Sequence, residues 1–248
     1  MITLGAASQR SPTYTALKAS IILFDIAPGT RTFTVPEGVS KLRVFVVGAG
    51  GSGSVATSGN YYSPGGGGGY AEKTIDVTPG QEFTYTVGAA VPYASRQQLS
   101  GETSSFGGLI SATGGKNGYS DSAATTQAGG QGIGGDVIAQ GGDGKAGGTL
   151  GAGAGSRFGK GTSVGPNRGG GFARVGDGWG IGLYDCGAPG IMLPGYFAPR
   201  MGAGGFPHAG SSGDYFVQIY PLVGGGGGSA QSFGSDGGVG AVGVEVLA

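Results

Sequence analysis

Hydrophobic and polar residues alternate along two parts of the chain, which is the pattern of strands with one buried face. The alternating runs cover residues 21–24, 32–35, 42–47, 70–77, 82–87, 103–106, 109–112 and 240–247. Turn signals separate several of them, including Pro28-Gly29 and Pro79-Gly80. Short strands at this spacing predict a mainly β fold built around a small antiparallel β-sandwich. No window combines a helical period with capping residues, so we expect almost no α-helix.

The last of these runs predicts that both ends of the chain belong to one sandwich. Alternation places Val242, Val244 and Val246 on the same face of a strand. Three valines on one face are too apolar for a solvated tail. We therefore expect them to pack against strands from the N-terminal part of the chain.

Between the two β-rich parts, glycine follows a three-residue period. Residues 129–165 contain 16 glycines, and nine of these share one register: 129, 132, 135, 141, 144, 147, 153, 159 and 165. This period is typical of packed polyproline II helices, in which three residues make one turn and only hydrogen fits at a crowded contact. The lack of proline excludes collagen, and recurring apolar residues disfavour the alternative of a flexible linker. We predict an inserted bundle of short, antiparallel polyproline II helices.

These patterns divide the chain into three parts. Residues 1–20 precede the first strand and are expected to serve attachment or assembly. The sandwich is expected from residues 21–113 together with 236–248, and the glycine-rich bundle from residues 114–235. Within the bundle, residues 172–223 hold nine of the chain's 23 aromatic residues, separated mainly by Gly and Pro. Aromatic side chains on such loops are typical of recognition surfaces, because they give a large contact area at a low entropy cost.

Composition limits the kinds of partner. Only 11 % of the 248 residues are charged and the formal net charge is zero, so there is no electrostatic basis for binding nucleic acid or a membrane surface. Glycine supplies 62 residues, yet 38 % of the chain is hydrophobic, which is enough to bury a core. No run approaches the roughly 18 apolar residues that span a membrane, and the first residues lack the pattern of a secretory signal. We expect a protein made in a cytoplasm, without membrane insertion.

The sequence offers only weak motifs for catalysis or cofactor binding. Residues 48–53 spell G-x-G-x-x-G after a strand, but a dinucleotide site needs a helix next, and the glycine run at 65–69 cannot form one. We interpret these glycines as the point where a strand enters the bundle. The single cysteine, Cys186, and the single histidine, His208, rule out a cysteine zinc cage and lack the flanks of a catalytic pair. We expect no enzyme, no cofactor and no metal.

Several glycine-rich and strand motifs cluster at the two ends of the chain. They are residues 33–51 (FTVPEGVSKLRVFVVGAGG), 65–70, 77–80, 85–88, 105–107 and 237–246. With these motifs, residues 31–113 and 224–248 resemble a glycine-rich domain of bacteriophage tail-fibre and tail-tip proteins. The middle of the chain is similar to the polyglycine bundles of T-even-type long-tail-fibre adhesins. A similar layout occurs in the glycine-rich extracellular region of anaplastic lymphoma kinase-type receptors, whose disulfides a chain with one cysteine cannot form.

The resemblance implies a phage adhesin that binds a receptor on a bacterial surface. It also implies a location in the virion tail, attachment to other tail proteins and a homotrimeric fibre, with a surface glycan or an outer-membrane protein as receptor. No contact residue carries over from the family, so the candidate receptor-binding residues come from the aromatic segment: Trp179, Tyr184, Tyr196, Phe197, Tyr215 and Phe216. Two alternatives stay open. An ice-binding polyproline II protein would show thermal hysteresis, and a tailspike-like glycan hydrolase would release oligosaccharides from host polysaccharide.

Overall fold

The structure is a computed structural model of the 248-residue chain. It describes residues 20–54, 63–92, 99–118, 126–146, 151–157, 159–161, 163, 223–227 and 236–247.

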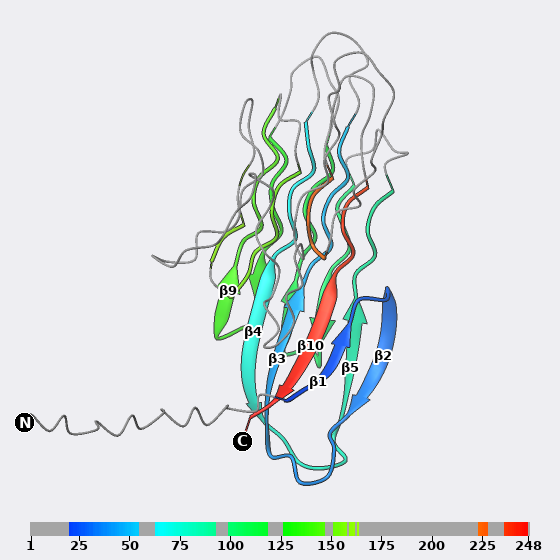
Figure 1. The fold of residues 1–248 in the computed structure, drawn as a ribbon, viewed down its shortest axis with the longest axis vertical. Coiled ribbons are helices and arrows are strands. Elements are labelled where there is room, and N and C mark those ends of the chain that lie inside the picture. Colours follow the sequence, from blue (N-terminus) through cyan, green and yellow to red (C-terminus); the bar gives the residue numbers. More distant parts are fainter. Residues whose placement is uncertain are drawn as a thin grey trace, which may run out of the picture.

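Ten strands form two five-stranded antiparallel sheets (Figure 1). The first sheet has the order β1 (Ser20–Asp25), β10 (Ala241–Val246), β3 (Lys41–Val47), β4 (Tyr70–Asp76) and β9 (Val137–Ala139). The second has the order β2 (Gly29–Thr34), β5 (Glu82–Val87), β6 (Ser104–Phe106), β7 (Ile110–Ala112) and β8 (Gly132–Ile133). The described residues contain no helix, and the predicted mainly β, sandwich-like fold is confirmed.

The main core lies between the two sheets. Alternate residues of β3, β5 and β10 point into it, as the period-two pattern requires. It contains Phe33, Leu42, Val44, Val46, Ala71, Phe83, Tyr85, Val87, Phe106, Ile110, Ala112, Val242 and Val244, among others. Val242 and Val244 are completely buried, and Val246 packs against the same cluster. The predicted common face of the C-terminal valines is therefore confirmed, because β10 lies between β1 and β3 in the first sheet.

A second cluster covers the outer face of the first sheet. Phe45 and Tyr70 are almost completely buried there and their rings stack at 6.4 Å. Phe45 lies opposite Gly243 on β10, and a Cβ on that glycine would lie 1.9 Å from the ring. Ala154 and Val223, which belong to the glycine-rich part of the chain, complete the cluster. Strands β3 and β10 are thus buried on both faces over residues 44–47 and 241–244, where their sequences contain no polar side chain.

Two strands were missed by the sequence pattern. The sequence interpretation places Ile133, Val137 and Ile138 in the bundle, but they lie in β8 and β9 at the edges of the two sheets. Gly134, at a φ of 77°, belongs to the turn that carries the chain from one sheet to the other. Strands of two and three residues between glycines are too short to show an alternating period, which is the physical reason for the error.

Above the sandwich, the chain continues as extended segments whose hydrogen bonds recur every third residue. The N–H of Gly65 donates to the carbonyl of Gly227 at 2.9 Å. Three residues later, the N–H of Gly68 donates to the carbonyl of Gly224 at 2.7 Å. In a β-strand, every second residue forms hydrogen bonds with the same neighbouring strand, whereas in a polyproline II helix every third residue faces the same neighbour. The predicted polyproline II bundle is therefore present, and the partners of Gly65 and Gly68 run antiparallel to them.

Segment 65–69 lies at the centre of this bundle. All five of its N–H groups and all five of its carbonyl groups are bonded to other segments. The N–H groups donate to three neighbouring segments, at residues 113–116, 142 and 224–227. The carbonyl groups accept from three others, at residues 48–51, 130 and 152–155. Six rods around one rod is hexagonal packing. Because a polyproline II helix has no internal hydrogen bonds, this arrangement is what satisfies the buried backbone.

The glycines of the predicted register face neighbouring backbones at close range. A Cβ added at residue 129, 132, 135, 141 or 144 would lie 2.6 Å or less from a backbone atom of another segment. Gly159 differs, because it occupies a turn at a φ of 134° with open space around it. Gly130, in another register, is as crowded as the others. Most described glycines of the three-residue period therefore lie at crowded contacts, but some crowded glycines, such as Gly130, lie outside this period.

The G-x-G-x-x-G stretch also serves packing. A Cβ on Gly48 would lie 2.1 Å from the carbonyl oxygen of Thr113, and one on Gly50 would lie 1.8 Å from that of Gly225. The residues described after it continue as bundle segments and not as a helix, so the arrangement for holding a pyrophosphate is not present in them.

The crowded register predicts unequal effects at two adjacent positions. Gly144→Val would place a Cβ 2.1 Å from the carbonyl oxygen of Pro64, whereas Lys145 is exposed. We expect Gly144→Val to cost about 3 kcal/mol or more of unfolding free energy, and Lys145→Val about 0.5 kcal/mol or less. Melting temperature and soluble yield of the two variants measure the difference. Equal behaviour of the pair would contradict the packed bundle.

Candidate functional site

The described chain is interrupted five times at the end of the bundle farthest from the sandwich. Both sides of each interruption lie at or next to this end, at residues 54 and 63, 92 and 99, 118 and 126, 146 and 151, and 227 and 236. Figure 1 shows the bundle segments rising from the strands towards it. We call this part of the bundle, formed by the flanking residues, the distal end.

Backbone hydrogen bonds fix the flanking residues of the distal end to one another. Gly118 donates to the carbonyl of Ser52 at 2.6 Å, and Asn117 donates to that of Leu99 at 3.0 Å. Further bonds join Gly227 to Gly51, Gly237 to Val91, and Gln127 to Gly144 in both directions. The five stretches 55–62, 93–98, 119–125, 147–150 and 228–235 therefore begin and finish on one rigid, cross-linked platform.

Four buried polar residues lie at or next to the distal end. Ser52, Ser63 and Asn117 are 1 % exposed or less, and Ser54 is 7 % exposed. The Oδ1 atom of Asn117 accepts a hydrogen bond from the N–H of Ser52 at 3.0 Å. The hydroxyl of Ser54 accepts from the N–H of Ser63 at 2.9 Å and donates to its carbonyl at 3.0 Å. The side chains of Ser54 and Asn117 thus add specific hydrogen bonds where the all-glycine packing ends, and the Ser54 hydroxyl holds both sides of the 55–62 stretch together.

The six candidate receptor-binding residues lie outside the described residues. Trp179, Tyr184, Tyr196, Phe197, Tyr215 and Phe216 all belong to the stretch 164–222. This stretch starts after Ser163, whose hydroxyl contacts Asp143, and it returns at Val223 in the cluster beside the sandwich. Its two flanks therefore differ from those of the other five stretches, because only those five both begin and finish at the distal end.

Sequence reasoning missed the common location of the five stretches. Each is bordered by glycine-rich segments, which was the available signal, but the pattern does not say that their borders meet at one end. The five stretches include Tyr61, Tyr62, Tyr93, Tyr119 and Phe233. These rings are additional candidates for a binding surface.

A buried charged cluster ties the bundle to the outer face of the first sheet. Glu72, on β4, is 7 % exposed and accepts a hydrogen bond from the hydroxyl of Tyr70 at 2.5 Å. The guanidinium of Arg157, in the bundle turn at 156–159, donates to both carboxylate oxygens of Glu72, with the Nε contact at 2.9 Å. Next to them, Arg43 pairs with Glu245 across β3 and β10. Each of these buried carboxylates is thus neutralised by an arginine, which gives the cluster a structural role.

The Tyr70 hydroxyl predicts a change of stability at alkaline pH. Burial, followed by its hydrogen bond to Glu72, raises the pKa of Tyr70 well above its ordinary value. The unfolded chain therefore loses this proton first, and stability falls as the pH rises above about 10. We expect Tyr70→Phe to cost about 1 kcal/mol at pH 8 but to flatten the alkaline decline. Urea unfolding at pH 8 and above pH 10 measures both; parallel declines in the two proteins would contradict the assignment.

Asp143 and its partners fix the bundle where the 164–222 stretch begins. Its Oδ1 accepts from the N–H of Gly129 at 3.0 Å, and its Oδ2 contacts Lys160 at 3.2 Å and Ser163 at 3.4 Å. Burial opposes ionisation of Asp143, but these hydrogen bonds and the Lys160 charge outweigh it and lower the pKa of the carboxyl group. The ionised form is therefore part of the folded structure at neutral pH.

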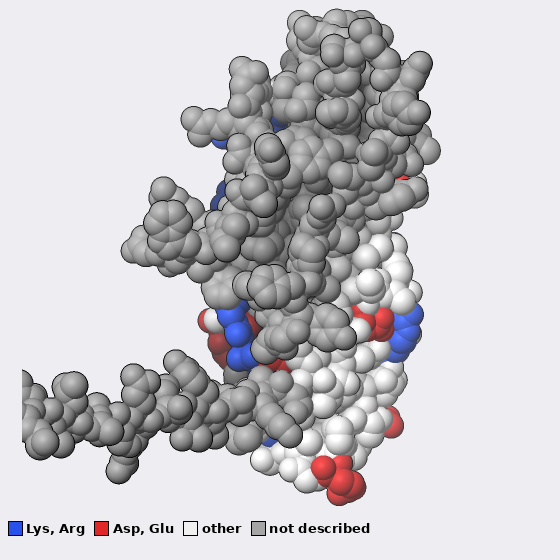
Figure 2. Space-filling view, viewed as in Figure 1, with Lys and Arg blue, Asp and Glu red and all other residues white. Residues whose placement is uncertain are grey.

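The described surface offers little charge for other kinds of binding. Figure 2 shows a few charged side chains scattered over the visible face of the sandwich. Within the described ranges, no group of three or more His, Cys, Asp or Glu side chains could hold a metal ion. The described residues also contain no helix that is long and apolar enough to cross a membrane. Cys186 and His208 lie outside them.

Comparison with known proteins agrees with this architecture. The sequence model of a family described as a glycine-rich domain matches residues 26–247, which include the bundle and every strand except β1. Among curated proteins, none matches the chain. Because the match extends over most of its length, the chain belongs to the glycine-rich domain family.

Proposed function

We propose that this protein is a bacteriophage tail-fibre or tail-tip adhesin that binds a receptor on the bacterial surface. The observation that carries the proposal is the distal end, where five stretches of chain begin and finish on one platform. Gathering several connecting stretches on one scaffold is a common way to build a recognition surface. The sandwich, whose first strand begins at Ser20, lies at the other end of the bundle and would face the rest of the fibre.

The bundle suits this function because it orders the platform before binding. Every backbone group of the central segment 65–69 is hydrogen-bonded, and neighbouring glycines leave no space for movement. A surface that is already ordered loses less conformational entropy on binding, so more of the contact energy appears as affinity. The polar side chains of Ser54 and Asn117 extend this order to the edge of the platform.

The chemistry of the five stretches favours a glycan or a polar protein surface as receptor. Their tyrosines combine a flat apolar ring, which can stack against the C–H face of a sugar, with a hydroxyl for hydrogen bonding. The balanced charge of the chain disfavours a strongly charged partner. The protein would be made in the host cytoplasm and assembled into the virion tail, with residues 1–20 contacting other tail proteins or the sister chains of a homotrimer.

The aromatic segment remains part of the proposed receptor surface. Trp179 stands in the sequence Gly176-Asp-Gly-Trp-Gly, whose glycines give its ring little local cover. We expect Trp179→Ala to weaken receptor binding by about 2 kcal/mol or more while the fold survives. Tryptophan emission gives an independent reading, since an exposed ring is accessible to quenchers and changes on adding host envelopes. A protected, blue-shifted emission, with binding intact in Tyr196→Ala and Phe197→Ala, would confine the contact surface to the stretches of the distal end, with Tyr61, Tyr62 and Tyr93 as candidates.

Adsorption to bacterial envelopes tests the proposed function. Purified protein is incubated with a panel of envelopes and bound protein is measured after sedimentation. Saturable, strain-selective adsorption that blocks infection by a phage using the same receptor is the expected result. Release of oligosaccharides from the envelopes would indicate a glycan hydrolase instead, and thermal hysteresis without adsorption would indicate an ice-binding protein.

A further inference from the structure

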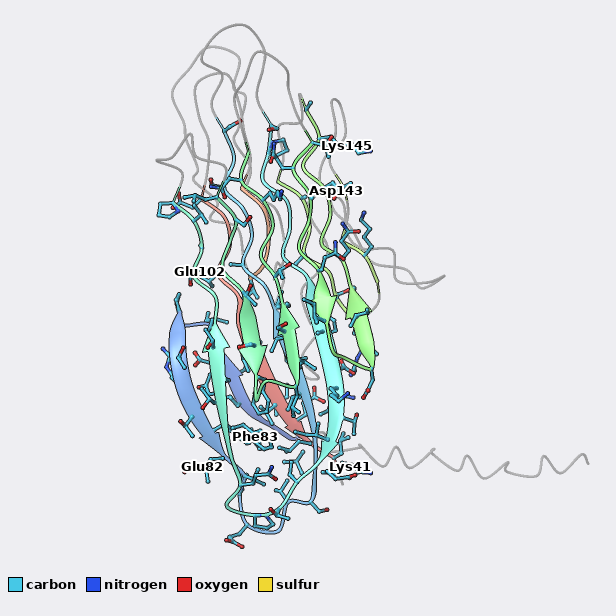
Figure 3. The ribbon with its side chains drawn as sticks, turned by 180° about the vertical axis from the view of Figure 1, so that it is seen from behind. Lys41, Glu82, Phe83, Glu102, Asp143 and Lys145 are labelled. Carbon is cyan, nitrogen blue, oxygen red and sulfur yellow. The ribbon has the colours of Figure 1, made fainter. Side chains whose placement is uncertain are left out.

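Large apolar side chains are exposed on two opposite sides of the sandwich. Among the described residues, six such side chains are at least 38 % exposed, and one of them, Leu99, lies at the distal end. The other five are Ile22, Ile26, Leu109, Ile133 and Ile138. They belong to the two ends of the sheet orders, where β1 and β2 stand at one end and β8 and β9 at the other. Figure 1 shows β2 and β9 on opposite sides of the sandwich, and Figure 3 shows the same arrangement from behind.

On one side, three of these residues surround the turn between β8 and β9. Ile133 lies in β8, and a Cβ on the preceding Gly132 would lie 3.2 Å from the Cβ of Ile138 in β9. A Cβ on Gly134 would lie 2.5 Å from the carbonyl oxygen of Leu109. The side chains of Leu109, Ile133 and Ile138 are 40 to 58 % exposed and form one apolar patch, which we call the β8–β9 side. Grouped apolar residues of this kind are typical of a contact surface.

On the opposite side, two isoleucines lie at the outer edge of the first sheet. Ile22, at an irregularity of the pairing between β1 and β10, is 38 % exposed, and Ile26, just after β1, is 45 % exposed. Beside them, the guanidinium of Arg31 on β2 donates to the carboxylate of Asp25 on β1 at 3.0 Å. This ion pair joins the edges of the two sheets. We call the two isoleucines and the ion pair the β1–β2 side.

The two sides differ in the charge that they present. Next to the β8–β9 side, Lys73 contacts Asp136 at 3.5 Å, and the carboxylate side chain is the more exposed, at 56 % against 33 %. In the ion pair of the β1–β2 side, Arg31 is the more exposed, at 39 % against 16 % for Asp25. A carboxylate therefore dominates one side and a guanidinium the other. Contact between the two sides would bring Arg31 of one copy towards Asp136 of the next, which is the complementarity that fixes an orientation.

Strand pairing places the two sides at the same height. One row of paired residues crosses the first sheet from β1 to β9: Asp25, Val242, Val46, Ala71 and Ile138. A row of the second sheet runs from β2 to β8: Thr30, Thr86, Ser105, Ser111 and Ile133. Neighbouring strands are about 4.8 Å apart, so a second copy shifted sideways by about 24 Å, at the same height, would set its β1–β2 side against the β8–β9 side of the first.

We propose that the β8–β9 side of one copy binds the β1–β2 side of a second copy standing in the same orientation. The contact covers the exposed isoleucines and Leu109 and pairs Arg31 with Asp136. It is heterologous, so each added copy leaves one side of each kind open until a rotation between copies closes a ring. All distal ends then point the same way, so that several receptor contacts act together. This last consequence rests on the proposed function, whereas the contact itself does not.

Sedimentation of the full-length protein and of lysine variants tests this contact. Ile138→Lys places a charge in the β8–β9 side and Ile26→Lys places one in the β1–β2 side, whereas Thr84→Lys adds the same charge to an exposed position on β5. We expect the parent and Thr84→Lys to associate as concentration rises, and the other two variants to associate about tenfold or more weakly. Ile133→Lys and Ile22→Lys replace a variant that does not fold. A parent protein that stays monomeric, or lysine variants that all associate like the parent, would overturn the proposal.

Mixing the two side variants distinguishes this contact from other modes of association. The Ile26→Lys copy keeps an intact β8–β9 side and the Ile138→Lys copy keeps an intact β1–β2 side, so together they can form one contact and no more. We expect the mixture to contain a dimer with one copy of each, which neither variant forms alone; a mixture that stays monomeric would overturn the proposal. Deleting residues 1–18 is expected to leave association unchanged, and its loss would place the contact in those residues and also overturn the proposal. Each side variant keeps its distal end, so its adsorption to bacteria tests the proposed function separately.

Discussion

Removing residues 240–248 is expected to abolish soluble folding. The deletion takes out β10, which is hydrogen-bonded to β1 on one side and to β3 on the other. Val242 and Val244 are completely buried, so both the core and the edge of β3 would be exposed to water. An exposed apolar edge of this length is a template for aggregation. Expression, sedimentation and thermal melting of the truncated protein measure the effect.

The matched control is a deletion of residues 1–18 at the other end of the chain. It leaves all ten strands intact, because β1 begins at Ser20. We expect this variant to stay soluble and to melt cooperatively, near the temperature of the full chain. A protein without residues 240–248 that also stays soluble and melts cooperatively would contradict the placement of β10 in the sandwich.

Gly68→Ala is expected to be the most damaging addition of a single methyl group. The new Cβ would lie 1.8 Å from the carbonyl oxygen of Gly48 and 2.5 Å from its carbon. The same residue donates to Gly224 at 2.7 Å and accepts from Gly155 at 2.9 Å, so it cannot shift without breaking bonds on other sides. We expect a loss of about 3 kcal/mol or more, which corresponds to a fall of roughly 6–12 °C in melting temperature.

Gly80→Ala is the control for backbone strain. Gly80 has a φ of 78°, so alanine is disfavoured there, but nothing lies within 4 Å of the new Cβ. We expect a cost of about 1 kcal/mol from the left-handed conformation alone. If Gly68→Ala is no more destabilising than Gly80→Ala, the close packing of segment 65–69 is wrong.

The sandwich could be predicted because its signals are local. Alternation in residues 82–87 and 240–247 sets which side chains face the core, and β5 and β10 follow these runs almost to the residue. The glycine period was also readable, since a crowded contact at every third residue leaves a mark within one segment. Residues such as Gly132 and Gly144 do face neighbouring backbones as this period requires.

The neighbours of each bundle segment could not be predicted. Gly65 bonds to Gly227 and Ala152, but nothing in a run of five glycines distinguishes these partners from other glycines. A glycine has no side chain to specify its register, so the register depends on the sandwich strands that continue into the bundle. The grouping of five stretches at the distal end follows from that long-range arrangement, so the sequence predicts the aromatic segment as a candidate surface but not the distal end.

Adsorption of variants of the distal end tests the central claim that this end binds the bacterial receptor. Each of the five stretches 55–62, 93–98, 119–125, 147–150 and 228–235 is replaced in turn by a Gly-Ser sequence of equal length. A sixth variant, Thr32→Phe on β2, serves as the control on the sandwich. The account predicts that at least one replacement abolishes adsorption to a susceptible strain while melting temperature stays within a few degrees of the parent, and that the control adsorbs normally. Full adsorption by all five replacement variants would show that the distal end is not the receptor-binding surface.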